Sequence, residues 1–118
     1  MSYDLQWEHH NHHLNKQLES FLKSKDFFDV TIVCDGKKQI KGHKVILAAG
    51  SEVFRNMLKD SNSSTTVYLR GVDSEEFSYL LKFLYSGSVT LPENMVMSKC
   101  IYRHVFFNDF LFFRFQTC

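Results

Sequence analysis

The stretch from Phe28 to Phe54 constrains the fold of this chain more than any other segment. Its first residues alternate in polarity with a period of two, which is typical of a half-buried strand, the inward positions being Val30, Ile32 and Cys34. The pair Asp35-Gly36 follows and tolerates the positive φ angles of a tight hairpin turn. After a second strand comes a short run, residues 45–49, that is too apolar to lie on a surface. The order hairpin, then buried short helix, predicts a compact α+β domain.

Length and charge narrow the possible classes of protein. A chain of 118 residues has room for one domain with a real core. Its apolar fraction of 44% and charged fraction of 23% are ordinary for a globular chain. The net charge is +1, and the lysines of the hairpin stand among acidic residues. Because a nucleic-acid site needs basic side chains clustered on one face, we expect no direct contact with nucleic acid.

The cysteines and the two ends predict an intracellular protein. Cys34, Cys100 and Cys118 fit neither a disulfide framework nor a zinc motif, which favours a reducing compartment. The first ten residues contain no apolar run of the kind that a secretory signal needs. Residues 101–118 are apolar but include five strongly polar side chains, so we expect no membrane span.

Seven elements of secondary structure are expected from local patterns. Residues 1–9 alternate like a strand, and a helix capped by Asn11 should run from there to residues 24–26. Two short helices are expected at 43–49 and 51–59, the second capped by Ser51. A strand at 66–70 leads into a helix that begins at Asp73, which forms a capping-box pattern with Glu76, and ends at Gly87. Residues 89–91 should form a short last strand.

Three stretches, in order, carry a resemblance to a known family. They are the leader Leu5-Gln6-Trp7, the block FFDVTIVCDGKKQIKGHKVILAAGSEVFRNML, and the later VYLRGVDSEEFSYLLKFLYSGSVTLP. Together, residues 5–98 resemble the BTB/POZ domain, in the tramtrack/bric-a-brac-like subgroup of insect-type transcription regulators. Gly42 stands where that family commonly has alanine. The resemblance implies an α+β fold, with a small mixed sheet, flanking short helices and an exchanged N-terminal strand and helix.

The C-terminal end departs from the family pattern. We expect residues 1–98 to form the BTB/POZ domain without its usual C-terminal helices, and residues 99–118 to form a divergent aromatic-rich tail. The tail is interpreted either as a truncated end that caps the body or as a partner-binding segment.

The resemblance implies a homodimer that exchanges its N-terminal segments. The candidate interface consists of Leu5, Trp7, Leu14, Leu18, Phe21 and Leu22. In the first helix, Leu14, Leu18, Phe21 and Leu22 fall on one apolar stripe that needs a surface to cover it. Spacing alone allows this helix to fold back on its own body equally well, and the resemblance favours exchange.

A charged pair is the second candidate site. Asp29 and Lys44 match positions that family members place near the central groove of the dimer, where a paired charge sets geometry and partner choice. The alternative is that Asp29 merely begins a strand and that Lys44 is solvated.

Other combinations of reactive side chains are weaker. His9 with His12 or His13 has chelating spacing, but no further ligand completes a site, so we expect no metal and no cofactor. Cys34 with His43 or His104 lacks a group to orient the base, so we expect no catalytic residue and no enzymatic activity.

The sequence therefore predicts a protein–protein interaction module that forms homo- or heterodimers of transcription regulators. Its expected partners are itself, other BTB proteins and co-regulators, with no membrane contact, and its expected location is the nucleus, with the cytoplasm as an alternative. A second interpretation is a substrate adaptor for a cullin-type ubiquitin ligase, which would use Leu58 and Asp60. A third is a truncated fragment without activity of its own.

Overall fold

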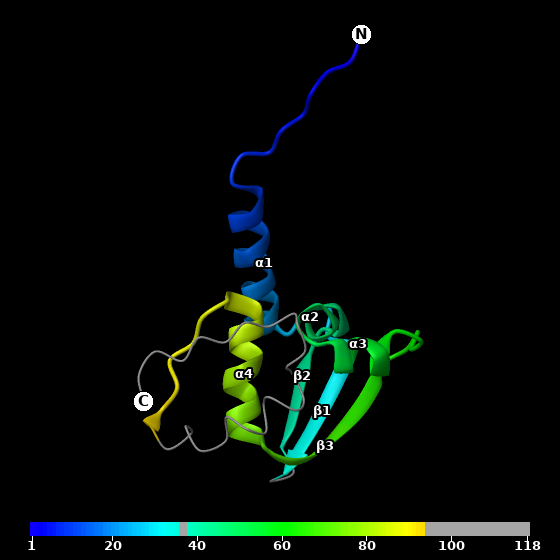
Figure 1. Ribbon diagram of the computed structural model, residues 1–118, viewed down its shortest axis with the longest axis vertical. Helices are drawn as coiled ribbons and strands as arrows, with labels where there is room; N and C mark the ends of the chain where they lie inside the picture. The colour runs from blue at the N-terminus through cyan, green and yellow to red at the C-terminus, as the bar shows by residue number, and fades with distance from the viewer. Residues whose placement is uncertain (36–37, 94–118) are drawn as a thin grey trace.

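The computed structural model of this chain describes residues 1–35 and 38–93 (Figure 1). Its elements follow in the order α1 (His10–Ser24), β1 (Val30–Asp35), β2 (Gln39–Gly42), α2 (Lys44–Gly50), α3 (Glu52–Leu58), β3 (Thr65–Asp73) and α4 (Ser74–Ser86). This is a small α+β fold, as the sequence predicted. The expected turn at Gly36 and the expected tail at 99–118 lie outside the described residues.

The sheet has the strand order β2-β1-β3, so the first strand lies in the middle. β2 pairs antiparallel with β1, with Ile32 opposite Ile40. β3 pairs parallel with β1, with Ile32 opposite Val67. A parallel neighbour requires a crossover connection, and α2 and α3 supply it at one end of the sheet (Figure 1).

Local capping fixes the helices of the body. The Ser51 side chain accepts a hydrogen bond from the backbone N–H of Phe54, which caps α3. The Asp73 carboxylate accepts hydrogen bonds from the N–H groups of Glu75 and Glu76, which caps α4. α4 ends at Gly87, whose φ of 84° is the left-handed conformation that glycine adopts without strain. These three expectations are confirmed.

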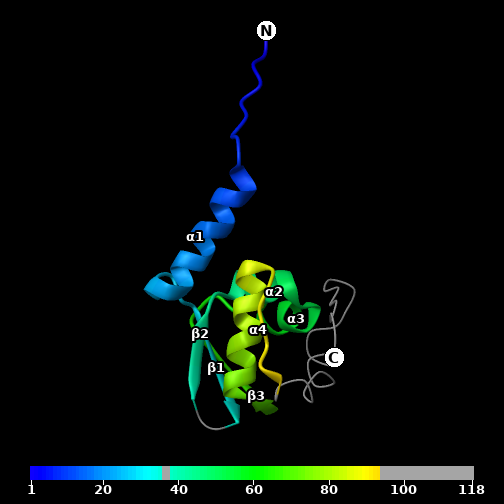
Figure 2. The ribbon, with the colours of Figure 1, turned by 90° about the vertical axis from the view of Figure 1, so that its left-hand side faces the viewer.

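The core lies between the sheet, α4 and the α2–α3 pair. β1 contributes its alternating inward side chains, as the pattern of period two predicted. Phe54 of α3 and Phe77 of α4 are fully buried and bring their rings to within 6.5 Å of each other. Figure 2 shows α4 in front of the sheet and α2 and α3 above it. The buried apolar side chains are Val30, Ile32, Cys34, Leu47, Phe54, Leu58, Val67, Val72, Phe77, Leu80, Leu81 and Tyr85.

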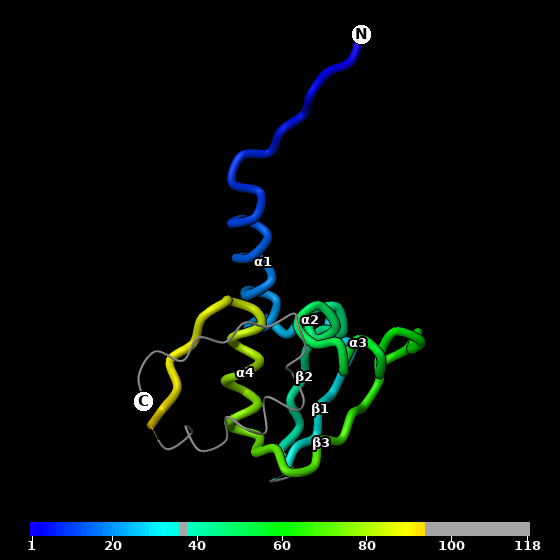
Figure 3. Tube along the Cα trace, in the orientation of Figure 1, coloured from blue at the N-terminus to red at the C-terminus, as the bar shows by residue number. Residues whose placement is uncertain are grey.

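The N-terminal segment differs from the sequence-based expectation in two ways. Residues 1–7 form no strand in the described chain, because a strand needs a neighbour for its backbone groups and none of the described strands meets them. The helix begins at His10 with His9 as its cap, so Asn11 lies inside the first turn and does not cap it. The tube in Figure 3 shows this segment leaving the body of the molecule.

Residues 89–91 also lack the expected strand in the described part of the chain. The same physical reason applies, since alternation of side chains defines a strand only where a second backbone pairs with it. In the described residues, no helix combines the length and the apolar character that crossing a membrane requires.

Candidate protein-interaction surface

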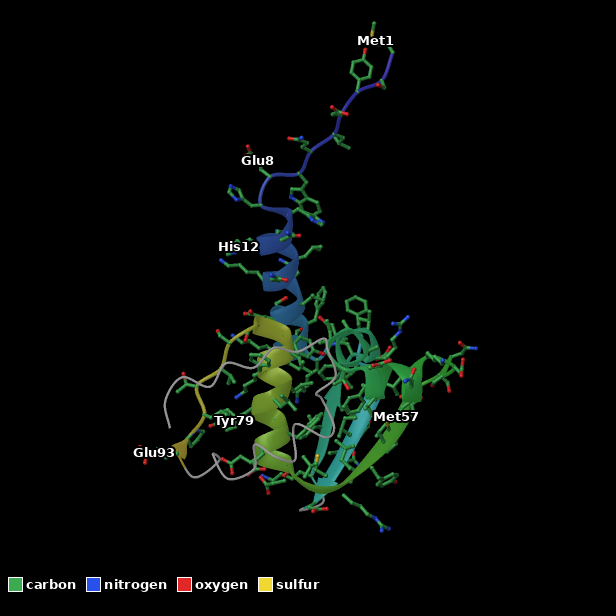
Figure 4. All side chains as sticks on the ribbon, viewed as in Figure 1. Met1, Glu8, His12, Met57, Tyr79 and Glu93 are labelled. Atoms are coloured by element: carbon green, nitrogen blue, oxygen red, sulfur yellow. The ribbon has the colours of Figure 1, made fainter. Side chains whose placement is uncertain are left out.

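The first helix stands away from the body and carries exposed apolar side chains. Leu5 is fully exposed, and Trp7 and Leu14 expose 58% and 41% of their surface. Figure 4 labels Met1, Glu8 and His12 along this projecting segment, far from the labelled Met57 and Tyr79 of the body. We call Leu5, Trp7 and Leu14 the N-terminal apolar surface.

The C-terminal half of α1 behaves differently, because it packs on its own body. Leu18 and Leu22 are half-buried against the hydrophobic core. Phe21 is half-buried, and its ring meets the ring of Phe27 edge to face at 5.2 Å. The six residues predicted for the interface therefore divide into two groups. Leu18, Phe21 and Leu22 anchor the helix, whereas the N-terminal apolar surface faces solvent in the single chain.

Aromatic contacts, rather than a side-chain cap, organise the start of α1. The Trp7 ring lies 4.8 Å from the ring of His10 and 5.2 Å from that of His13. His9 makes no capping hydrogen bond through its side chain. The Trp7 side chain thus packs against the first turn of the helix, and 58% of its surface remains exposed.

Phe27, just after the C-terminal end of α1, is a further exposed apolar side chain that the sequence analysis missed. Its side chain is 76% exposed, and its backbone has a φ of 64°. That conformation is unusual for a bulky side chain and must be imposed by its neighbours. The preceding Lys25 also has a positive φ as the C-cap of α1. No residue pattern in this turn signals either angle, since neither residue is glycine or asparagine.

Asp29 and Lys44 meet, but through the backbone of Lys44. The Asp29 carboxylate accepts a hydrogen bond of 2.7 Å from the N–H of Lys44, the first residue of α2. The Lys44 ammonium donates instead to the Ser61 hydroxyl at 2.8 Å and to the Ser63 carbonyl. Asp29 thus caps α2 from a distance, and Lys44 ties α2 to the loop before β3. The structure brings these two predicted residues together in a way that differs from a simple ion pair.

A buried histidine joins three segments next to this pair. The Nε2 of His43 lies 2.8 Å from the carbonyl oxygen of Asp26, which can only accept, so Nε2 donates. In the neutral ring Nδ1 then accepts from the Tyr85 hydroxyl, which in turn accepts from the backbone N–H of His43 at 3.1 Å. His43 is therefore a structural residue. Burial is the main cause that raises the pKa of Tyr85 to about 12.

The remaining predicted residues are placed as follows. Leu58 is buried in the core, so of the two residues considered for cullin contact, only Asp60 is exposed. The Cys34 thiol is buried, and burial, with Asp35 and Asp73 adding to it, raises its pKa to about 11. Within residues 1–35 and 38–93, no three histidine, cysteine or acidic side chains are grouped so that they could hold a metal ion.

The fold thus combines a projecting N-terminal helix with a capped α2–α3 crossover. Residues 18–104 match the BTB/POZ domain family, and the chain belongs to that family. BTB domains of transcription factors mediate protein–protein interaction and dimerisation, and BTB domains bind other BTB proteins.

Similar proteins place the chain within the family. It is 39% identical to Transcription factor Ken of Drosophila melanogaster over 95 residues, which is 78% of this chain and 16% of that relative. It is 34% identical to human BTB/POZ domain-containing protein 9 over 88 residues, 71% of this chain and 14% of the relative. The chain thus spans a small part of the length of these relatives.

Solved structures confirm the fold. The BTB domain of human Gigaxonin aligns with a TM-score of 0.71 at 26% identity, covering 90% of this chain and 87% of that one. The BTB domain of zebrafish PATZ1 aligns with a TM-score of 0.72 at 22% identity, covering 87% of this chain and 85% of that one. The predicted α+β BTB/POZ fold is therefore confirmed.

Proposed function

We propose that this chain forms homo- or heterodimers through its N-terminal apolar surface, as a module of transcription regulation. The observation that carries the proposal is the division of α1, whose C-terminal half is anchored on the body while Leu14 and the leader face solvent. A second copy, or another BTB protein, would cover the exposed half. Leu18, Phe21 and Leu22 would then hold the helix at the angle from which it meets the partner.

An exchanged twofold arrangement would bury the N-terminal apolar surface in both subunits. Burying an apolar side chain of this size contributes roughly 1.5–3 kcal/mol. A twofold contact buries the same surface in both subunits, so the free energy from burying Leu5, Trp7 and Leu14 is gained once in each subunit. Residues 1–7 would pair as a strand with the partner's sheet, which would supply the backbone partners that the described chain does not offer.

Sedimentation velocity of the full chain tests the dimer. We expect the native chain to sediment as a dimer and the double variant Trp7→Ala/Leu14→Glu as a monomer with an unchanged circular dichroism spectrum. The matched control is Lys16→Ala, since Lys16 lies on the same helix, is exposed, and is separated from Leu14 by about 200° around the helix axis. A folded native chain that stays monomeric at high micromolar concentration would contradict the proposal.

The regulatory role is proposed from the relatives. Several of them are named as transcription factors, among them Transcription factor Ken of Drosophila melanogaster and Transcription factor Ken 1 of Culex quinquefasciatus. These names support the proposal that the chain acts in the nucleus, paired with itself or with such relatives and in contact with co-regulators. Co-expression with the BTB domain of a relative, followed by size-exclusion chromatography, would show a mixed dimer; separate elution would contradict heterodimer formation.

A cullin adaptor role gains no support from the described surface. Leu58 is 4% exposed and holds α3 to the core, so a partner could reach Asp60 without its apolar neighbour. We do not propose this function.

A further inference from the structure

A groove separate from the N-terminal apolar surface lies where four segments meet. It has a volume of about 450 Å³ and is bordered by the end of α1, the connection to β1, the strand β2 and the middle of α4. Figure 2 shows the end of α1 close to the top of β2 and α4. We call it the lysine groove.

The charged side chains that line the lysine groove all carry positive charge. Its apolar lining comes from Leu22, Phe28, Ile40 and Leu81. Three lysines, Lys25, Lys41 and Lys82, also line it, together with the neutral polar side chains of Gln39 and Ser78. Among the described residues that line the groove, none is acidic. Lys82 also lies over the ring of Tyr79, 5.2 Å from its centre.

One wall of the groove is the edge of the sheet. The strand order β2-β1-β3 leaves one side of β2 without a neighbouring strand in the described sheet. Residues 39–41 of that strand all border the groove. An edge strand offers backbone donors and acceptors to an added strand, and alternate side chains of that strand enter pockets beside it.

We propose that the lysine groove binds an extended acidic segment of a partner protein, laid along β2. The carboxylates of that segment would meet Lys25, Lys41 and Lys82, and alternate apolar side chains would contact Phe28, Ile40 and their neighbours. Charge complementarity selects this occupant, since three ammonium groups without a carboxylate among them attract an acidic chain and repel a basic one. The inference goes beyond dimer formation, because Leu5, Trp7 and Leu14 do not line this groove.

Fluorescence polarisation of the full chain tests the proposal. The probe is a fluorescein-labelled peptide of about six residues, the usual length of a strand, that alternates glutamate with valine. We expect saturable binding that weakens with added salt and that is lost when glutamine replaces glutamate in the probe. The double variant Lys41→Glu/Lys82→Glu should bind the probe at least about tenfold more weakly, as expected for loss of charge pairing.

The control variant Lys16→Glu/Lys59→Glu changes the net charge by the same amount at exposed lysines outside the groove. It should keep the affinity of the native chain, and Lys41→Arg/Lys82→Arg should do the same. Thermal melting of every variant shows that it is folded. Hydrogen exchange with the bound probe should slow the amides of residues 39–42.

Three results would overturn the proposal. They are no binding of the probe, equal weakening in the groove and control variants, or binding without protection of the β2 amides. Sedimentation separates this proposal from the dimer. If Lys41→Glu/Lys82→Glu turned the dimer into a monomer, a second copy would be the occupant of the groove, and the acidic segment would be excluded.

Discussion

The Tyr85 hydroxyl accepts a hydrogen bond of 3.1 Å from the backbone N–H of His43, a residue 42 positions earlier in the sequence. Through the His43 ring, the same hydroxyl is linked to the carbonyl oxygen of Asp26, just after α1. One phenol therefore joins the last turn of α4, the start of α2 and the segment that carries α1.

Removing this hydroxyl should destabilise the domain. Tyr85→Phe leaves the His43 N–H and ring Nδ1 without their partner in a buried place, and such an unsatisfied group costs about 1–3 kcal/mol. Urea unfolding followed by circular dichroism measures the loss. Tyr79→Phe is the control, because Tyr79 is half-buried on the same helix and no hydrogen bond of its hydroxyl is seen in the described structure. Equal losses in the two variants would contradict the assigned role.

A double-mutant cycle distinguishes the observed Asp29–Lys44 contact from an ion pair. Asp29→Ala removes the cap of α2 and should cost about 1–2 kcal/mol of unfolding free energy. Lys44→Met removes the link to Ser61 and Ser63 and should cost about 0.5–1.5 kcal/mol. Since the two side chains act on different partners, their coupling energy should stay below about 1 kcal/mol, at the low end for residues in contact. A larger coupling energy from the urea midpoints would indicate a direct charge interaction.

The end of α4 depends on a backbone conformation that favours glycine. Gly87→Ala must hold a side chain at a φ of 84° and should lower the unfolding free energy by about 1 kcal/mol. Gly42→Ala is the comparison, because Gly42 has no left-handed φ and an added Cβ would lie 3.5 Å from the Tyr85 hydroxyl, an ordinary contact. Thermal melting should therefore show the larger loss for Gly87. The reverse order would contradict the assigned geometry.

Alkaline pH should destabilise the domain through two buried groups. The pKa of Cys34 rises from 9.0 to about 11 and that of Tyr85 from 10.0 to about 12. Because both are raised in the folded state, the native chain holds protons that the unfolded chain releases. Their stabilising contribution is complete below about pH 9 and is lost as the pH rises toward 11 and 12.

Urea midpoints between pH 8 and pH 11 check this dependence. Cys34→Ala should flatten the part of the curve that lies between pH 9 and pH 11. In a separate measurement at pH 8, iodoacetamide should label Cys34 slowly in the native chain and rapidly in urea, with the site read by mass spectrometry. Fast native labelling of Cys34 would show that the thiol is not buried.

Features set by a few neighbouring residues could be predicted from the sequence. The hairpin, the Ser51 and Asp73 caps and the glycine stop at Gly87 each depend on side chains within one or two turns of the chain. The family resemblance added the overall fold. Residues 89–91 were wrongly expected to form a strand, and residues 1–9 form none within the described chain, because alternation says nothing about whether a second backbone lies beside it.

The candidate sites were harder to predict, since they depend on distant pairs. The contact of Asp29 with Lys44 was expected, but the sequence could not show that a backbone N–H would be the partner. Nothing in the sequence singled out Tyr85, because its hydrogen-bond partner lies on another element. Leu14 is exposed whereas Leu18 and Leu22 pack against the core. This difference depends on where the body of the domain lies beside α1, and the spacing of apolar residues along α1 does not reveal it.

The central position of β1 has a consequence for the order of folding. Its antiparallel neighbour β2 begins only a few residues later, so that pairing closes a short loop at small entropic cost. Its parallel neighbour β3 follows α2 and α3 in the sequence, so the pairing of β1 with β3 closes a much longer loop. The hairpin can therefore serve as an early template, and the pairing of β3, which has to close the longer loop, is the slower step.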